Sequence, residues 1–315
     1  MNGPYTPLDA TYAAARWGWY VAAFLVLGAG SYAPFLVRLR TGLDATHPEL
    51  AVDLARRAAG IGSRAALALL LLAAFRLYLE TRTLLDPGDR VTAELLRATL
   101  STGWGRGWLR QSVMALLAAV AFVSAGRGAT FGWMVAAAAS GGVGFTAGMT
   151  GHAVTSRAGP GGFLLDAAHV WAGGLWLGGL AVLFLAGLPA CRGLPAEERP
   201  VLLRALVADF SRRALLFGPL TMGLGVWLAA RYLGWSWPFH LTESSYGLVL
   251  AVKLAALAAV AAMGAYNWRV VQPALARPEG EERIGRSAGL ELLFGLLLLA
   301  ATAVLVALPF PDEAM

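Results

Sequence analysis

The chain has 315 residues, of which 58% are hydrophobic and only 14% are charged, and its mean hydropathy is +0.62. Soluble domains carry about 25% charged residues, so this composition indicates an integral membrane protein and leaves no room for a large soluble domain. The single cysteine, Cys191, excludes internal disulfides and cysteine-rich metal clusters. The net charge of +6 comes mostly from arginines that flank apolar runs, which predicts anchoring at the membrane interface rather than nucleic-acid binding.

Eight apolar segments are long enough to cross a bilayer, for which about 20 residues are needed. In chain order they are residues 17–36, 60–79, 108–126, 131–151, 162–188, 214–232, 245–268 and 288–308. The long connection over residues 80–107 contains ELLRATL, which we expect to form a short interfacial helix. The sequence therefore predicts an all-α polytopic membrane protein, built as a bundle of eight transmembrane helices.

The arginines are distributed unevenly between the two ends of these segments, and this asymmetry predicts the orientation. Fourteen arginines lie in the connections after the first, third, fifth and seventh segments, against eight on the other side. Positive charges collect on the cytoplasmic side of membrane proteins. We therefore expect both termini to face outside.

Polar residues that are unusual in hydrocarbon gather in the outer half of the predicted bundle. Ionisable side chains are costly inside a membrane, and where they occur they mark functional sites. Asp166 and His169 lie in the first two turns of the fifth segment, and Lys253 reaches a comparable depth in the seventh. The full set in this half is His152, Asp166, His169, His240, Glu243 and Lys253. We expect the function of the protein to lie here.

The sequence GMTGHA ends the fourth segment and places Met149 and His152 three residues apart, on one helix face. Imidazole and thioether together suit copper, and the thioether favours Cu(I). In the alternative interpretation His152 binds a loop carbonyl and Met149 only fills space, since methionine is a common gap-filler. The spacing alone leaves both interpretations open.

His169 lies deeper, inside the hydrocarbon, which favours a functional role. Asp166 stands one turn earlier and is expected to hold one ring nitrogen, as carboxylates often do behind a metal-bound histidine. The alternative is a structural hydrogen bond from His169 to a neighbouring helix. Lys253 is either a coordinating or gating charge or a side chain that snorkels to the interface. His47, in an inner loop, is expected to have no special role.

Small residues predict a close helix crossing next to these polar groups. Gly144 and Gly148 stand four apart in the fourth segment, and Gly174 and Gly178 do so in the fifth. Such pairs let helix backbones approach each other closely. We expect the two segments to pack through these glycines.

Three stretches of the second half together resemble one family. His169, with the WAGGLWLGGL that begins two residues later, is similar to the histidine and W-x-G-G signature of the copper resistance D family (CopD and PcoD). Residues 209–234, DFSRRALLFGPLTMGLGVWLAARYLG, resemble the family's helix with R-F-S. Residues 242–268, TESSYGLVLAVKLAALAAVAAMGAYNW, resemble its Y-G-x-x-L-x-x-K-L helix. The resemblance covers roughly residues 140–308.

The resemblance implies a multi-pass protein of the bacterial inner (plasma) membrane that takes part in copper transport or copper resistance. The implied ligand is a copper ion, and the implied partners are membrane lipid and a periplasmic copper carrier of the CopC type. Carried over residue by residue, the resemblance points to His152 and His169, and also to Lys253 and Tyr246. Together with the spacing arguments above, the expected copper site contains His152, His169 and Met149, with Asp166 behind His169. The candidate gating or supporting residues are Lys253 and Tyr246, with His240 and Glu243 added by their place in the outer loop.

The same resemblance divides the chain into a weakly matching part with three spans, residues 1–130, and a CopD-like part with five spans, residues 131–315, which carries the site. No phosphate-binding loop, nucleophile elbow or HExxH pattern occurs in the sequence. We therefore expect a protein that is not an enzyme.

Two alternative functions stay open from the sequence. A haem-binding electron-transfer protein would use the same histidines as axial ligands, although their expected depths differ. An accessory subunit of a larger membrane complex would use its polar residues only to join helices.

Overall fold

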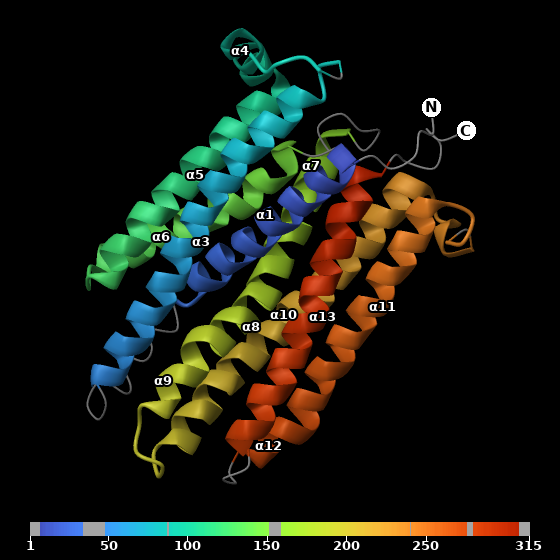
Figure 1. Cartoon of the computed structure of the whole chain (residues 1–315). Helices are drawn as coiled ribbons and strands as arrows, with labels where there is room; N and C mark the ends of the chain where they lie inside the picture. The colour runs from blue at the N-terminus through green and yellow to red at the C-terminus, as the bar shows by residue number, and fades with distance from the viewer. Residues whose placement is uncertain are drawn as a thin grey trace.

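Figure 1 shows a computed structural model of the protein, in which residues 7–33, 48–86, 88–150, 159–239, 241–275 and 280–308 are described. These residues form helices and turns, with no strand among them. The helices lie side by side in an elongated bundle, and the start of the first helix and the end of the last helix lie at one end of it (Figure 1). The all-helical prediction is therefore confirmed.

Four long helices form the first half of the chain. They are α1 (Pro7–Ser31), α3 (Pro48–Arg82), α5 (Gly103–Gly126) and α6 (Thr130–Thr146), which the short 3-10 turn η1 (Ala147–Thr150) extends. The connection between α3 and α5 contains α4 (Ala93–Ser101), whose first turn is capped by the Thr92 hydroxyl. The expected short helix in this connection is thus present.

The second half begins with a continuous rod of α- and π-helical pieces. The rod consists of α7 (Gly159–Gly173), η3 (Gly174–Gly178), α8 (Gly179–Val182), η4 (Leu183–Gly187) and α9 (Leu188–Arg192). The remaining elements are α10 (Arg199–Leu233), η5 (Trp237–Phe239), α11 (Ser245–Tyr266), η6 (Asn267–Val271), α12 (Gln272–Ala274) and α13 (Gly280–Ala307). In Figure 1, α9 and α12 mark the end of the bundle opposite to the start of α1 and the end of α13.

Six helices among the described residues are long and apolar enough to cross a membrane. They are Pro48–Arg82, Gly103–Gly126, Gly161–Arg192, Arg199–Leu233, Ser245–Ala274 and Gly280–Ala307. The other two expected spans correspond to α1, which carries Arg16 among its apolar residues, and to α6, which is 17 residues long before the 3-10 turn begins. The structure thus supports a multi-pass membrane protein with at least six candidate spans, and it does not test the orientation.

Helix α1 occupies the middle of the bundle and joins its two halves. It packs against α3 and α6 on one side and against η3, α8 and α13 on the other (Figure 1). At its crossing with the rod, a Cβ atom placed on Gly28 would lie 2.1 Å from the Gly178 carbonyl oxygen, and one on Gly178 would lie 1.9 Å from the Phe24 carbonyl oxygen. The two backbones touch, and only glycine fits at both positions.

The glycines predicted to join the fourth and fifth segments have two different partners. Gly144 and Gly148 do face α7, since a Cβ on Gly144 would meet Trp171 and one on Gly148 would meet Asp166. Gly174 and Gly178 instead face α1, so this part of the prediction was wrong. The α1 sequence offers the matching Gly28 at the same depth, and this pairing gives the closer backbone approach.

A charged cluster at the other end of α1 joins the two halves a second time. Arg213 on α10 forms an ion pair with Asp209, with 2.7 Å between Nη2 and Oδ2. The same guanidinium donates to the carbonyl (3.3 Å) and the hydroxyl (3.0 Å) of Ser31, the last residue of α1. A cation here satisfies the carbonyls that a helix end leaves unpaired.

The glycine crossing makes a prediction about stability. Gly178→Ala should destabilise the protein by about 1–3 kcal/mol, because the added methyl group has to separate the backbones of α1 and the rod. Gly285→Ala on α13 is the matched control, since a Cβ there meets nothing within 4 Å. Thermal unfolding in detergent measures both, and a Gly178→Ala variant with wild-type stability would contradict the described crossing.

Candidate functional site

The imidazole of His169 is held by a backbone carbonyl of the neighbouring helix. Its Nδ1 atom lies 2.9 Å from the carbonyl oxygen of Thr221 on α10. A carbonyl oxygen only accepts hydrogen bonds, so Nδ1 carries the proton and donates it. In the neutral ring, Nε2 then keeps its lone pair and is the nitrogen that can bind a metal ion.

Helix α10 is shaped to receive this ring. A Cβ atom on Gly225, one turn after Thr221, would lie 3.0 Å from Cε1 of His169. By the rise of an α-helix, His169 lies roughly 15 Å along α7 from its start, and Thr221 roughly 18 Å from the end of α10 at the same end of the bundle. The hydrogen bond therefore joins two antiparallel helices at one depth.

Asp166 and Lys253 interact electrostatically near this histidine. The positive charges of Lys253 and Arg16 act on the Asp166 carboxyl group, and Lys253 also acts on the His169 ring. The expected role of Asp166 as the partner of a His169 ring nitrogen is not what the structure shows, since the Thr221 carbonyl binds Nδ1. Asp166 instead faces Gly148 and the charges of α1 and α11.

Two buried arginines converge on η1, at the end of α6. Arg16 on α1 is 6% exposed and Arg76 on α3 is 2% exposed. The Arg16 Nη2 atom donates to the Thr150 carbonyl oxygen at 3.1 Å, and the Arg76 Nη2 atom donates to the Thr150 hydroxyl at 3.1 Å. Gln111 on α5 adds bonds to the Thr146 carbonyl at 2.8 Å and to the Thr150 hydroxyl at 3.3 Å. Three helices thus fix the last described residue before His152.

The remaining predicted site residues divide into described and undescribed ones. His152 and His240 lie outside the described residues. Met149 is half-buried in η1, and its sulfur lies 3.9 Å from a guanidinium nitrogen of Arg110 on α5. The Met149 sulfur therefore faces α5, and its partner there is Arg110 rather than His169.

Tyr246 and Lys253 lie on the same face of α11, seven residues apart. Tyr246 interacts electrostatically with Tyr232 near the end of α10, and Glu243 is exposed in the turn before α11. These residues therefore line the same end of the bundle as His169. They do not form a dense ligand cluster, since no group of three or more His, Cys, Asp or Glu side chains suited to a metal occurs in the described part of the chain.

Arg16, Arg76 and Glu291 are buried ionisable residues that the sequence pattern did not single out. Arg76 and Glu291 both fall inside predicted apolar segments. His169 was selected because ionisable residues inside a membrane mark function, and the same rule could have selected these two residues. Arg16 was assigned to the segment end as an interfacial anchor. Its burial depends on α3 and η1, which the sequence pattern does not bring together.

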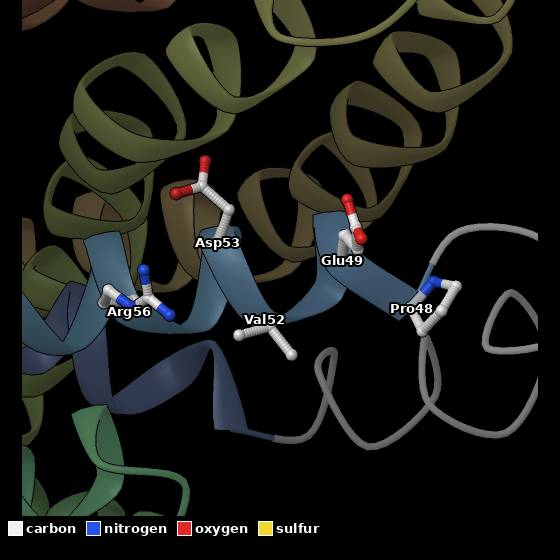
Figure 2. Close-up of a pocket in the computed structure, with 5 residues that line it drawn as sticks. All are labelled: Pro48, Glu49, Val52, Asp53 and Arg56. Atoms are coloured by element: carbon white, nitrogen blue, oxygen red, sulfur yellow. The ribbon is translucent and has the colours of Figure 1, made fainter.

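A surface pocket lies at the start of α3, away from these groups. It is lined by Pro48, Glu49, Val52, Asp53 and Arg56 (Figure 2). Glu49 and Asp53 project from the same side of the helix one turn apart (Figure 2), and Arg57 pairs with Asp53 at 2.6 Å. The start of α3 lies at the opposite end of this helix from Arg76, so the pocket is not part of the candidate site.

The long apolar helices and their intramembrane polar residues define a multi-pass membrane protein with a polar site at one end. Two family models match the chain. The copper resistance protein D model matches residues 204–305, and the model of the copper resistance protein D-like N-terminal domain matches residues 7–162. The chain therefore belongs to the copper resistance protein D family. No match was found among curated proteins or solved structures.

The two matched stretches meet at the candidate site. Thr221, Gly225 and Lys253 lie in the C-terminal match, whereas Arg16 and Thr150 lie in the N-terminal match. Asp166 and His169 lie on α7, between the two. The rod that carries His169 thus connects the two family domains.

The geometry of His169 makes a spectroscopic prediction. Nitrogen-15 NMR of histidine-labelled protein, assigned with His169→Ala, should show a protonated Nδ1 and an unprotonated Nε2 for this ring. Gly225→Val should displace the ring and change both signals, because a side chain here overlaps Cε1. Gly223→Val is the matched control, since a Cβ on Gly223 meets nothing within 4 Å. An unchanged His169 signal in Gly225→Val would refute the described contact.

Proposed function

We propose that this protein moves copper across the bacterial inner membrane, with His169 as the central ligand of a site that opens to the periplasm. The observation that carries this proposal is the hydrogen bond from His169 Nδ1 to the Thr221 carbonyl. It fixes the ring and directs the basic Nε2 away from that bond, the arrangement that metal-bound histidines need. Membership in the copper resistance protein D family is the reason why copper is the proposed metal.

The other ligands in this proposal come from the neighbouring chain segments. His152 follows Thr150 by two residues, and Thr150 is fixed by Arg16, Arg76 and Gln111. Met149 is the remaining soft donor in this segment, and it would have to turn from Arg110 to reach the metal. Imidazole and thioether ligands suit copper, and few donors allow the ion to leave again.

Asp166 and Lys253 control the charge at the site in this proposal. A copper ion that approaches His169 is repelled by the Lys253 ammonium group and attracted by the Asp166 carboxylate, both of which already interact. Tyr246, His240 and Glu243 would supply polar groups at the opening. A periplasmic copper carrier of the CopC type would deliver the ion, and the protein would catalyse no reaction.

The proposed topology has eight spans and both termini in the periplasm. Helices α1 and α6 would be the two further spans, in addition to the six long apolar helices. The arginine asymmetry of the sequence supports this orientation. The haem-binding and accessory-subunit functions gain no support from the family matches.

The copper function is tested with histidine variants. His169→Ala should strongly reduce the copper content of the purified protein and remove copper-dependent growth effects, because it removes the central ligand. Asp166→Asn should weaken binding less than His169→Ala does, because it removes a nearby negative charge that attracts the ion and not a ligand. His47→Ala is the control with a histidine outside the site. Wild-type copper content in His169→Ala would reduce His169 to a structural link between α7 and α10.

The topology is tested with paired cysteines on the two sides of α10. Cys191 itself is 0% exposed and cannot report sidedness, so the background is Cys191→Ser. Ser236→Cys, beyond the end of α10, should react with a membrane-impermeant maleimide in cells with a permeabilised outer membrane. Ala196→Cys, before its start, should react only after the inner membrane is opened. Both positions are exposed, and the reverse pattern would overturn the orientation.

A further inference from the structure

A second polar pair lies within the bundle, far from His169. Glu291 on α13 is 2% exposed, and its Oε2 atom accepts a hydrogen bond of 2.7 Å from the Nδ2 amide of Asn267. Asn267 begins the π-helical turn η6 at the end of α11. Gly264, one turn earlier, leaves room for the carboxyl group, since a Cβ there would lie 3.4 Å from Oε1.

The pair is incomplete as long as the carboxyl group is ionised. The Oδ1 atom of Asn267 is buried and has no hydrogen-bond partner among the described residues. An ionised carboxylate only accepts hydrogen bonds, so it cannot satisfy this oxygen. A protonated carboxyl group has one O–H donor and can bond Oδ1 while it still accepts from Nδ2. The unpaired amide oxygen therefore matches a carboxyl group that carries a proton.

The charged groups on the elements packed around α13 have other partners. Lys253 on α11 acts on Asp166 and His169, and Arg16 on α1 binds Thr150. Arg269 on η6 is exposed and lies over the Trp268 ring. Among the described residues, only the Asn267 side chain interacts with the Glu291 carboxyl group.

At the start of α13 the charged side chains pair with one another or across to α9. Glu282 binds Arg286, and Glu281 binds Arg192 at the end of α9.

Another buried carboxylate in the bundle shows what an ionised carboxylate requires. Asp209 on α10 has two arginine partners, Arg213 at 2.7 Å and Arg212 at 3.6 Å. Buried charges are costly unless they are paired. Glu291 is buried like Asp209 but has no arginine partner among the described residues. Its carboxyl oxygens are hard donors, which suit a proton better than Cu(I).

We propose that Glu291 and Asn267 form a proton-binding site, and that protonation and release at this carboxyl group are coupled to copper movement. Glu291 lies roughly 16 Å along α13 from its start, and Asn267 lies at the far end of α11 from Lys253. The proton site is therefore in the half of the bundle opposite to the copper site. The proton binds Oε1, whose O–H donates to Asn267 Oδ1 while Oε2 accepts from Nδ2. On release the proton passes to water and leaves an ionised carboxylate. The coupling rests on the proposed copper function, whereas the proton site does not.

Infrared difference spectroscopy across a pH titration tests the proton site alone. Wild-type protein should show the C=O band of a protonated carboxyl group in a dry environment, and Glu291→Gln should lose it. Asn267→Leu should keep the band but shift its frequency, because the hydrogen bonds to the carboxyl group are gone. Glu282→Gln, exposed on the same helix, and His169→Ala should both retain the wild-type band. A band that persists unchanged in Glu291→Gln would overturn the proton site.

Reconstitution in liposomes that contain a pH-sensitive dye tests the coupling. Copper addition to wild-type and Glu282→Gln liposomes should produce a proton flux, which Glu291→Gln should lose. Copper uptake without proton flux in the wild type would overturn the coupling. Absence of copper uptake in the wild type would instead contradict the proposed copper function, and the infrared result would still decide the proton site.

Discussion

The backbone contact between Gly28 and Gly178 is the constraint on which the other features of the bundle depend. At each of the two glycines, a carbonyl group of the opposite helix lies so close that a methyl group does not fit. This contact brings α1 against the rod that carries His169, and α1 in turn carries Arg16 to the end of η1. In hydrocarbon, where apolar burial gives little net attraction between helices, such close packing is a main source of helix association. A wider crossing would move the Arg16 side chain away from both Thr150 and Asp166.

The buried arginines give this packing a chemical consequence. Arg16 and Arg76 place two positive charges inside the bundle, and the Nε atom of each has no hydrogen-bond partner among the described residues. The negative charges nearby are Asp166, on which Arg16 acts, and Glu80, which accepts a hydrogen bond from Tyr12 at 3.0 Å. Buried charges persist only when they are paired or functional. Asp166 therefore lies within the influence of Arg16 from the N-terminal domain and of Lys253 from the His169 region.

The sequence was sufficient for the helical class and for most of the spans, because apolar runs of about 20 residues in a chain with 14% charge rarely form anything except membrane helices. It also placed His169 and Lys253 at a comparable depth, and in the structure the Lys253 charge acts on the His169 ring. It did not identify Thr221 as the partner of His169, since a backbone carbonyl has no sequence signature. It assigned Gly178 to the wrong helix, because any helix with a matching glycine satisfies the same pattern. The N-terminal family match covers residues whose resemblance was weak by motif alone.

The two polar sites within the bundle each stand next to a departure from regular α-helix. His169 precedes the π-helical turn η3, and Asn267 opens the π-helical turn η6. Such turns are frequent at functional sites, since an extra residue in the turn changes which side chains share a face. The rod after His169 contains a second π-helical turn, η4, so the helix that joins the two family domains departs from regular α-helix at two places. Small changes at these turns would rotate His169 or Asn267 relative to their partners on α10 and α13. The turn η3 also contains Gly178, so these irregular segments are where the proposed copper site and the proposed proton site could be coupled.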